Sequence, residues 1–161
     1  MALKLIYTLF LGLLVALFVG LGIDAFYEGP KAPDYPSELS LQKTDCGEYP
    51  ELKAEQEKFD QDMKDFNEKS KAYNRNVSIL SLAFAILILI ASLTLFSKIK
   101  LIADGILLGG TFTTVYSIIR GLMSENSKFR FLIVTVGLII ALVLGYIKFI
   151  RPKENEGQQK N

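Results

Sequence analysis

The chain has 161 residues, of which 50% are hydrophobic, and it carries a formal net charge of +1 with one cysteine and no histidine. One cysteine excludes an internal disulfide, and the lack of histidine excludes a metal site built from a cluster of His and Cys ligands. No glycine-rich loop ending in Lys-Ser or Lys-Thr is present, so we expect neither an enzyme nor a cofactor. We also identify no nucleic-acid partner and no small-molecule substrate.

Four apolar stretches are each close to the length that crosses a bilayer. A spanning helix needs roughly 20 largely apolar residues, because the hydrocarbon core is about 30 Å thick. The stretches are residues 5–23, 77–97, 101–119 and 131–147. They predict an all-α fold, a four-helix transmembrane bundle in which a long extramembrane helix is continuous with the second span. The predicted segments are a first transmembrane helix (1–27), a Pro-rich extramembrane linker (28–50), an extramembrane amphipathic helix (51–76), a three-helix transmembrane region (77–150) and a polar disordered tail (151–161).

The first span starts with a short basic segment, as a cleaved signal peptide would. Its apolar run is longer than the usual signal-peptide core of about 7 to 15 residues, so we expect an uncleaved anchor. Asp24 lies near the far end of this span, at the same expected boundary as Arg75 and Arg120. An ion pair between Asp24 and one of these arginines would fix the register of the helices, although an intramembrane carboxylate is also a candidate functional group.

The segment after the first span contains several prolines, which favour an extended chain. We expect residues 29–36 to run along the membrane surface as a stiff spacer, with a ligand for an aromatic groove as the alternative. Residues 12–36, GLLVALFVGLGIDAFYEGPKAPDYP, resemble the first span and exit of small uncharacterised four-helix membrane proteins of candidate-phylum bacteria, a resemblance that implies no activity. Cys46 follows in the same segment, as a free thiol or, in an oxidising exterior, as an intermolecular bridge.

One continuous helix is predicted from residue 51 through the second span to residue 97, because the sequence contains no glycine or proline there. At about 1.5 Å per residue this helix would be about 70 Å long, and roughly half of it would project from the bilayer. A narrow apolar seam with heptad spacing follows the projecting half. The seam residues are Leu52, Phe59, Met63, Phe66 and Tyr73. The seam predicts a partner, either in the same chain, where residues 39–46 would fold back, or in a second protomer or another protein.

The third span is the most polar of the four. Together with Asp24 of the first span, its candidate polar residues are Asp104, Thr113, Ser117 and Arg120. The hydroxyls could line an aqueous path, or they could bond the backbone of their own or a neighbouring helix. We expect Asp104 close to a boundary and within reach of a lysine. The lysines concerned are Lys98, Lys100 and Lys148. A re-entrant or tilted segment is the alternative to a full crossing.

Small residues recur at every fourth position in three of the spans. In lipid, helices associate largely through close backbone approach at such residues. They are Gly12, Ala16 and Gly20 in the first span, Gly105 and Gly109 in the third, and Gly137, Ala141 and Gly145 in the fourth. We expect these residues at helix contacts, either within the chain or between protomers.

Orientation in a membrane follows the Lys and Arg residues of short flanking segments. Those on one face of the predicted bundle are Lys4, Lys98, Lys100, Lys148, Arg151 and Lys153. We therefore expect a multi-pass cell-membrane protein with cytoplasmic termini and residues 28–76 outside, with the inverted topology as the alternative. The functional hypothesis is a scaffold or accessory subunit of an envelope complex, whose acidic extramembrane helix binds a protein partner or a second copy. The alternative is a small oligomeric channel or transport component lined by the third transmembrane helix.

Overall fold

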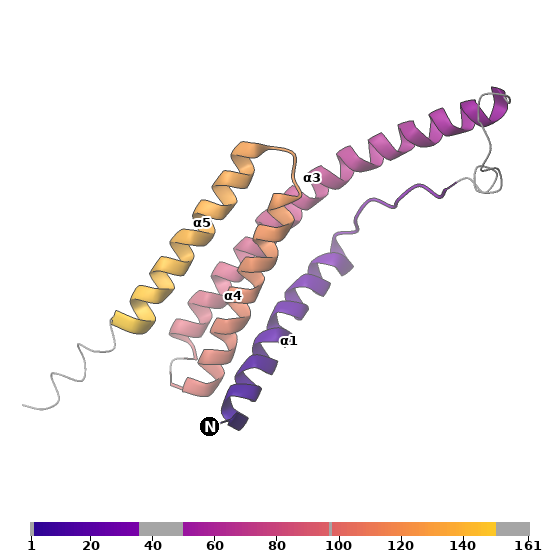
Figure 1. Cartoon of the computed structure of the whole chain (residues 1–161). Coiled ribbons are helices and arrows are strands. Elements are labelled where there is room, and N and C mark those ends of the chain that lie inside the picture. The colour runs from indigo at the N-terminus through magenta and orange to yellow at the C-terminus, as the bar shows by residue number, and fades with distance from the viewer. Residues whose placement is uncertain (1, 36–49, 97, 151–161) are drawn as a thin grey trace, which may run out of the picture.

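The computed structural model describes residues 2–35, 50–96 and 98–150. Four α-helices make up this part of the chain, which contains no strand, and a π-helical turn, η1 (Tyr146–Ile150), follows the last of them (Figure 1). The α-helices are α1 (Ala2–Phe26), α3 (Pro50–Thr94), α4 (Lys100–Leu122) and α5 (Ser127–Gly145). The predictions for Cys46, for residues 39–46 and for the tail at 151–161 lie outside the described residues, as does the side chain of Leu52.

The all-α fold class and the long helix predicted through the second span are confirmed. The helix α3 runs unbroken for 45 residues, since no proline interrupts its backbone hydrogen bonds after the first position. Four helical segments are long and apolar enough to cross a membrane, which is consistent with a multi-pass integral membrane protein. They are Ala2–Phe26, Lys53–Thr94, Lys100–Leu122 and Ser127–Lys148. The polar third segment is thus a continuous helix of spanning length.

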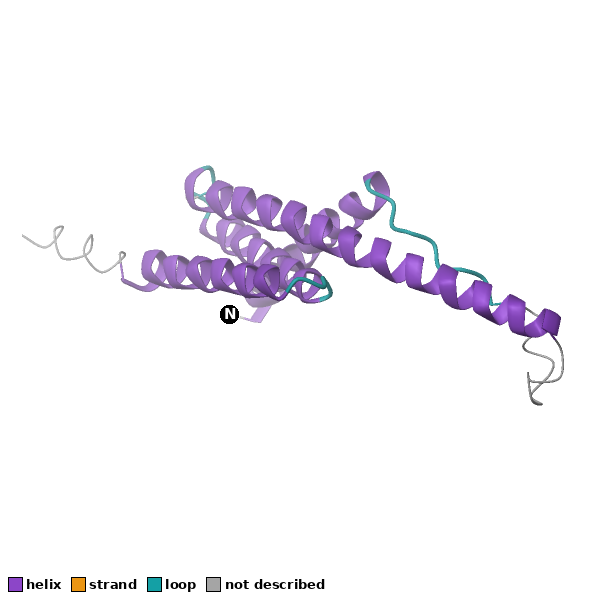
Figure 2. Ribbon diagram, turned by 90° about the horizontal axis from the view of Figure 1, so that it is seen from above, coloured by secondary structure: helices purple, strands orange, loops and turns teal. Residues whose placement is uncertain are grey.

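The helix α4 is the centre of the bundle. It packs against α3, α1 and α5 (Figures 1 and 2). The helix α5, by contrast, contacts α4 but neither α1 nor α3. Only 6% of the apolar window of α5 is buried, so most of its surface is available to lipid. The start of α1, the start of α4 and the end of α5 lie at one end of the bundle (Figure 1). Lys4 and Lys100 lie near Asp104 there, and Lys148 pairs with Asp104, so we call this end the lysine end. Residues 50–76 of α3 project from the other end, and we call them the stalk.

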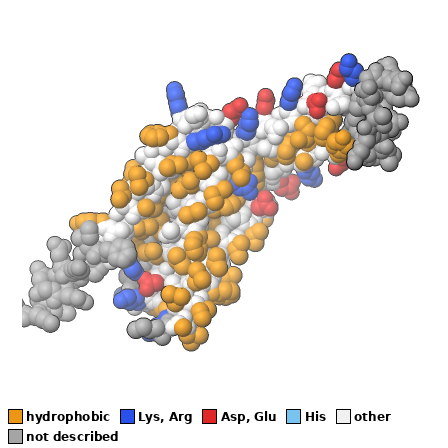
Figure 3. Space-filling view, viewed as in Figure 1, with side chains coloured by type: hydrophobic (Ala, Val, Ile, Leu, Met, Phe, Trp, Pro, Cys, Tyr) orange, Lys and Arg blue, Asp and Glu red, His pale blue; other side chains and the backbone are white. Residues whose placement is uncertain are grey.

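The interior of the bundle is filled mainly by small and hydroxyl side chains rather than by large apolar ones. Ser78, Ser92 and Ser117 are almost completely buried, whereas Phe18 is 80% exposed. Apolar side chains instead cover the outside of the bundle, and charged side chains gather along the stalk and at the lysine end (Figure 3). This distribution is the one expected where lipid surrounds the helices, because hiding leucine from lipid gains little.

Close packing depends on glycines at two of the helix interfaces. Between α1 and α4, a Cβ added at Gly109 would lie 2.6 Å from Val15 Cβ and 3.1 Å from the carbonyl oxygen of Gly12. Between α3 and α4, a Cβ added at Gly110 would lie 2.6 Å from Leu89 Cδ2. The two glycines are adjacent in sequence and therefore face different neighbours, which lets α4 touch α1 and α3 at the same level.

Hydroxyl groups join α3 to α4 across this second interface. Ser78 Oγ donates to the carbonyl oxygen of Ser117 at 2.7 Å, and Ser117 Oγ donates to the carbonyl oxygen of Ser78 at 2.7 Å. Nearer the lysine end, Ser92 Oγ donates to the carbonyl oxygen of Ala103 at 2.7 Å. These bonds leave no polar group of the three serine side chains facing lipid, where an unsatisfied group is costly.

Candidate functional site

The base of the stalk holds the densest group of polar contacts in the described part of the chain, centred on Arg120 in the last turn of α4. Arg120 Nη1 donates to Asn74 Oδ1 at 2.8 Å, and Arg120 Nε donates to the hydroxyl of Tyr116 at 3.0 Å. Its guanidinium carbon lies 5.8 Å from the ring centroid of Tyr73 and 5.4 Å from that of Tyr116, within cation–π range. Arg120 therefore holds α4 to the base of the stalk.

Tyr73 extends this contact from the stalk to α1. Its hydroxyl lies 3.1 Å from the carbonyl oxygen of Tyr27 and 3.5 Å from Asp24 Oδ1. Its ring stacks on the ring of Tyr27, with centroids 5.2 Å apart and planes inclined by 7°. Asn76 Nδ2 adds a hydrogen bond of 2.9 Å to the Tyr27 hydroxyl. We call the whole group the Arg120 cluster. Its members are Asp24, Tyr27, Tyr73, Asn74, Asn76, Tyr116 and Arg120.

The ion pair predicted between Asp24 and Arg75 or Arg120 is absent from the described residues. A tyrosine takes its place: Asp24 faces the hydroxyl of Tyr73, and Arg120 lies over the ring of the same residue. The sequence predicts Tyr73 as a seam residue, but it predicts neither the contacts that Tyr73 makes here nor the other two tyrosines of the cluster. The available signal was the recurrence of Tyr at the expected membrane boundary, where amphipathic rings are enriched.

The linker that follows α1 runs along the stalk rather than away from it (Figures 1 and 2). At one end of the contact, a Cβ at Gly29 would lie 3.2 Å from Tyr73 Cε1. At the other end, the ring of Tyr35 meets that of Phe59 edge-on, with centroids 5.3 Å apart. An extended chain advances roughly 25 Å from Tyr27 to Tyr35 at about 3.1 Å per residue. The helix advances about 21 Å from Tyr73 back to Phe59 at about 1.5 Å per residue, so the two lengths match.

The linker therefore contacts two residues of the predicted seam within the same chain. The described seam residues Phe59, Met63, Phe66 and Tyr73 are all half-buried. The predicted intrachain partner, residues 39–46, lies outside the described residues, and the observed one is the segment before it. Prolines in the linker keep it extended, which suits it to following a straight helix better than to turning onto the membrane surface.

The loop between α4 and α5 is tied to the base of the stalk. Lys71 Nζ lies 2.9 Å from Glu125 Oε1, and Arg130 Nε donates to the carbonyl oxygen of Ser124 at 2.6 Å. Asn126 caps α5, because its side chain accepts from the backbone N–H groups of Lys128 and Phe129. The Lys71–Glu125 pair is exposed and adds little stability by itself, but it joins the loop before α5 to the base of the stalk.

At the lysine end, Asp104 binds Lys148, one of the three lysines expected within reach. Lys148 belongs to the π-helical turn η1, so the pair joins α4 to the end of the fourth span. Both side chains remain partly exposed. An exposed ion pair at a helix end has a structural explanation and does not by itself indicate catalysis or transport.

The hydroxyl stripe of α4 lies inside the bundle. Thr113 is 1% exposed and its Oγ1 donates to the carbonyl oxygen of Gly109 at 2.8 Å, while Ser117 bonds α3 as described above. Both hydroxyls are satisfied by backbone groups and neither faces an aqueous path within the chain. The channel hypothesis, which needs these side chains in a lumen, gains no support from their position.

The small residues expected at helix contacts divide into two groups. Gly12, Gly105 and Gly109 lie at the α1–α4 interface, and Gly137 meets Ile118 of α4. Gly20 and Gly145 have nothing within 4 Å of an added Cβ, Ala16 is half-buried and Ala141 is exposed. Gly20 and Gly145 therefore make no close packing contact of the kind expected within the described residues. Gly110 and Gly121 also pack closely. Gly110 falls outside the four-residue spacing, and Gly121 continues it only beyond Thr113 and Ser117.

Within the described residues, no group of three or more His, Cys, Asp or Glu side chains could hold a metal ion. The contacts described above hold helices and linker together, and none of them forms a catalytic arrangement of nucleophile and base. No protein-family model matches the chain, and no curated protein or solved structure is significantly similar to it.

Proposed function

We propose that the chain is a scaffold or accessory subunit of an envelope complex, and that the stalk is its docking element for another protein. The observation that carries this proposal is the continuity of α3, whose stalk and membrane-spanning half form one helix. At about 1.5 Å per residue the stalk reaches about 40 Å from the bundle. A rigid projection of this kind holds a partner at a fixed distance from the membrane.

The bracing of the stalk supports the same proposal. The Arg120 cluster fixes its base to α1 and α4, and the linker lies along it as far as Phe59. A helix that was only a passive spacer would not need contacts with three other segments. We propose the positive-inside orientation, with the lysine end in the cytoplasm and the stalk outside.

The surface that we assign to the partner is the face of the stalk opposite the seam. At about 100° per residue, positions 57, 61, 64 and 68 lie on that face. Their side chains, Glu57, Gln61, Lys64 and Glu68, are all exposed. The linker lies on the opposite side of the stalk, so it leaves this charged face open.

Site-specific photo-crosslinking in native membranes tests the proposal. A photoreactive residue placed at Gln61 should give one defined heterologous adduct, and Glu57→Lys with Glu68→Lys should abolish it by reversing the charge of the docking face. The same photoreactive residue at Leu138, which is 59% exposed on α5, is the control for contacts within the lipid. An adduct that survives both charge reversals, or no protein adduct at Gln61, contradicts docking at this face. A crosslink between two copies of the chain would replace a heterologous partner with self-association.

A further inference from the structure

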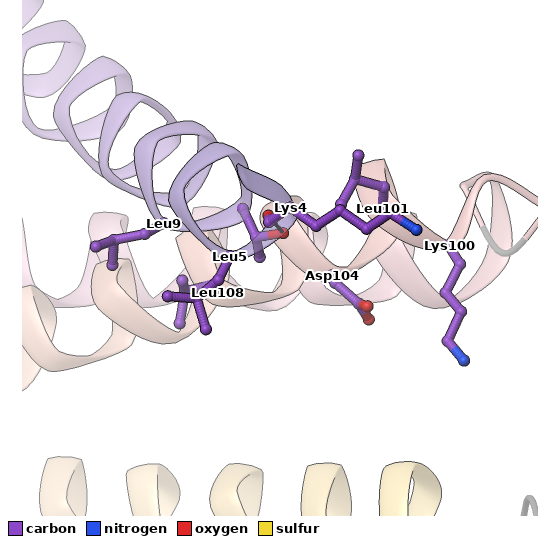
Figure 4. A pocket seen from close by; sticks show the side chains of 8 residues that line it. Lys4, Leu5, Leu9, Lys100, Leu101, Asp104 and Leu108 are labelled. Atoms are coloured by element: carbon purple, nitrogen blue, oxygen red, sulfur yellow. Dashed lines mark hydrogen bonds between the residues drawn. The ribbon is translucent and has the colours of Figure 1, made fainter. Parts of the chain in front are cut away.

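A groove opens between α1 and α4 at the lysine end (Figure 4). Its volume is about 900 Å³, within the range of about 300 to 1,000 Å³ typical of ligand sites. The walls are leucines of both helices, and two lysines stand at the mouth. The lining residues that matter here are Leu5, Leu9, Leu101, Leu108, Lys4 and Lys100.

The mouth of the groove carries an excess of positive charge. Asp104 also lines it, but this carboxylate is already paired with Lys148. Within the described residues, Lys4 and Lys100 form no ion pair, and both are exposed. Figure 4 shows the two lysines at the end of the groove, with Leu9 and Leu108 deeper along it. A basic mouth above an apolar slot is complementary to an amphiphile with an anionic head.

We propose that this groove binds an anionic phospholipid, with its phosphate between Lys4 and Lys100 and an acyl chain along the leucines. The groove lies at the ends of the spanning helices, where phospholipid headgroups are found. From Leu101 to Leu108, α4 descends about 10 Å towards the middle of the bundle, which is deep enough for part of an acyl chain. Basic pockets between transmembrane helices recognise phosphate-bearing headgroups in this way.

A membrane lipid fits the groove better than a soluble anion does. Inorganic phosphate would contact only two exposed lysines, whose attraction is weakened by water and salt. A phospholipid adds the apolar contacts of the leucine walls. Each lysine near the headgroups favours an anionic over a zwitterionic lipid by about fivefold, so the pair should give a preference of about 25-fold.

Native mass spectrometry of the full chain in detergent measures this preference directly. The protein is titrated with phosphatidylglycerol and with phosphatidylcholine of the same acyl chains. We expect about 25-fold tighter binding of phosphatidylglycerol than of phosphatidylcholine. This preference should be nearly lost in Lys4→Gln with Lys100→Gln. The matched control, Lys98→Gln with Lys128→Gln, removes the same charge outside the groove and should keep the preference. Leu9→Trp, which fills the groove and leaves the lysines in place, should weaken binding of both lipids.

Three results would overturn the proposal. The first is an unchanged preference in the Lys4 and Lys100 variant. The second is an equal loss in the Lys98 and Lys128 control, since the preference would then follow net charge alone. The third is displacement of phosphatidylglycerol by inorganic phosphate at similar concentration, because the site would then take a free anion. All the lysines changed are exposed, and circular dichroism of each variant checks that its helices are retained.

Discussion

The contact between α1 and α4 at Gly109 provides a quantitative test of the bundle. An added Cβ at this position would lie 2.6 Å from Val15 Cβ and 3.1 Å from the carbonyl oxygen of Gly12. Neither clash can be relieved by a change of rotamer, because the Gly12 oxygen belongs to the backbone and Val15 Cβ is bonded directly to the backbone. In Gly109→Ala, α1 must therefore move away by about 1 Å to restore ordinary carbon–carbon contact.

The expected loss follows from two opposing terms. Overpacking of a close interface costs typically about 1–3 kcal/mol, whereas replacing glycine by alanine within a helix gains up to about 1 kcal/mol of propensity. The matched control is Gly20→Ala, because nothing lies within 4 Å of an added Cβ at Gly20. The propensity gain cancels between the two variants. Gly109→Ala should therefore be less stable than Gly20→Ala by about 2 kcal/mol, or about 30-fold in the unfolding equilibrium.

Unfolding in mixed micelles by titration with sodium dodecyl sulfate, followed by circular dichroism, measures this difference. Gly109→Ala should unfold at a clearly lower detergent fraction than either the unmodified chain or Gly20→Ala. Equal midpoints for the two alanine variants would refute the reasoning, since they would mean that α1 does not approach α4 at this position. Destabilisation by Gly20→Ala as well would mean that a contact outside the single chain buries that glycine.

Three further predictions use the same titration. Arg120→Met should lower the free energy of unfolding by about 2 kcal/mol, because it removes two hydrogen bonds and two ring contacts. Its control, Arg75→Met, changes an exposed position and should stay within about 0.5 kcal/mol of the unmodified chain. Equal losses in the two variants would exclude a bracing role for the cluster. Ser117→Ala should lose about 0.6 kcal/mol and at most about 1.7 kcal/mol, the range measured for interhelical hydrogen bonds in membranes; no loss would contradict the α3–α4 bond. Asp104→Asn should lose less than about 1 kcal/mol at low salt and nothing at high salt, since its pair with Lys148 is partly exposed; a larger, salt-independent loss would place the pair in the hydrocarbon core.

The fold could be predicted from the sequence because it depends on two strong signals. Apolar runs of bilayer length identify the spans, and the lack of glycine and proline after Pro50 predicts the length of α3. The α3–α4 hairpin follows from a connection too short for any other arrangement. These features are local in the sequence and need no knowledge of which side chains meet.

The partners within the bundle were harder to predict because they depend on rotation of each helix about its axis. Four-residue spacing selects Gly20 and Gly145 as readily as Gly109, yet only the last faces a neighbouring helix. Gly110 meets α3 because the residue before it already faces α1, and single-helix patterns do not contain that information. Charge matching likewise favoured an arginine for Asp24, whereas the neighbour it faces is the hydroxyl of Tyr73.

The position of the linker bears on how a partner could use the stalk. A helix that docked on the seam would have to displace the linker and lose the ring contacts of Tyr27 with Tyr73 and of Tyr35 with Phe59. Aromatic pairs contribute about 0.5–1.5 kcal/mol each, so displacement would weaken such a partner by roughly 5- to 150-fold. A partner on the charged face loses nothing of this kind. The sequence alone predicts that the seam could bind any apolar helix, but in the structure the linker contacts it within the same chain and braces the stalk. We therefore assign docking to the opposite face.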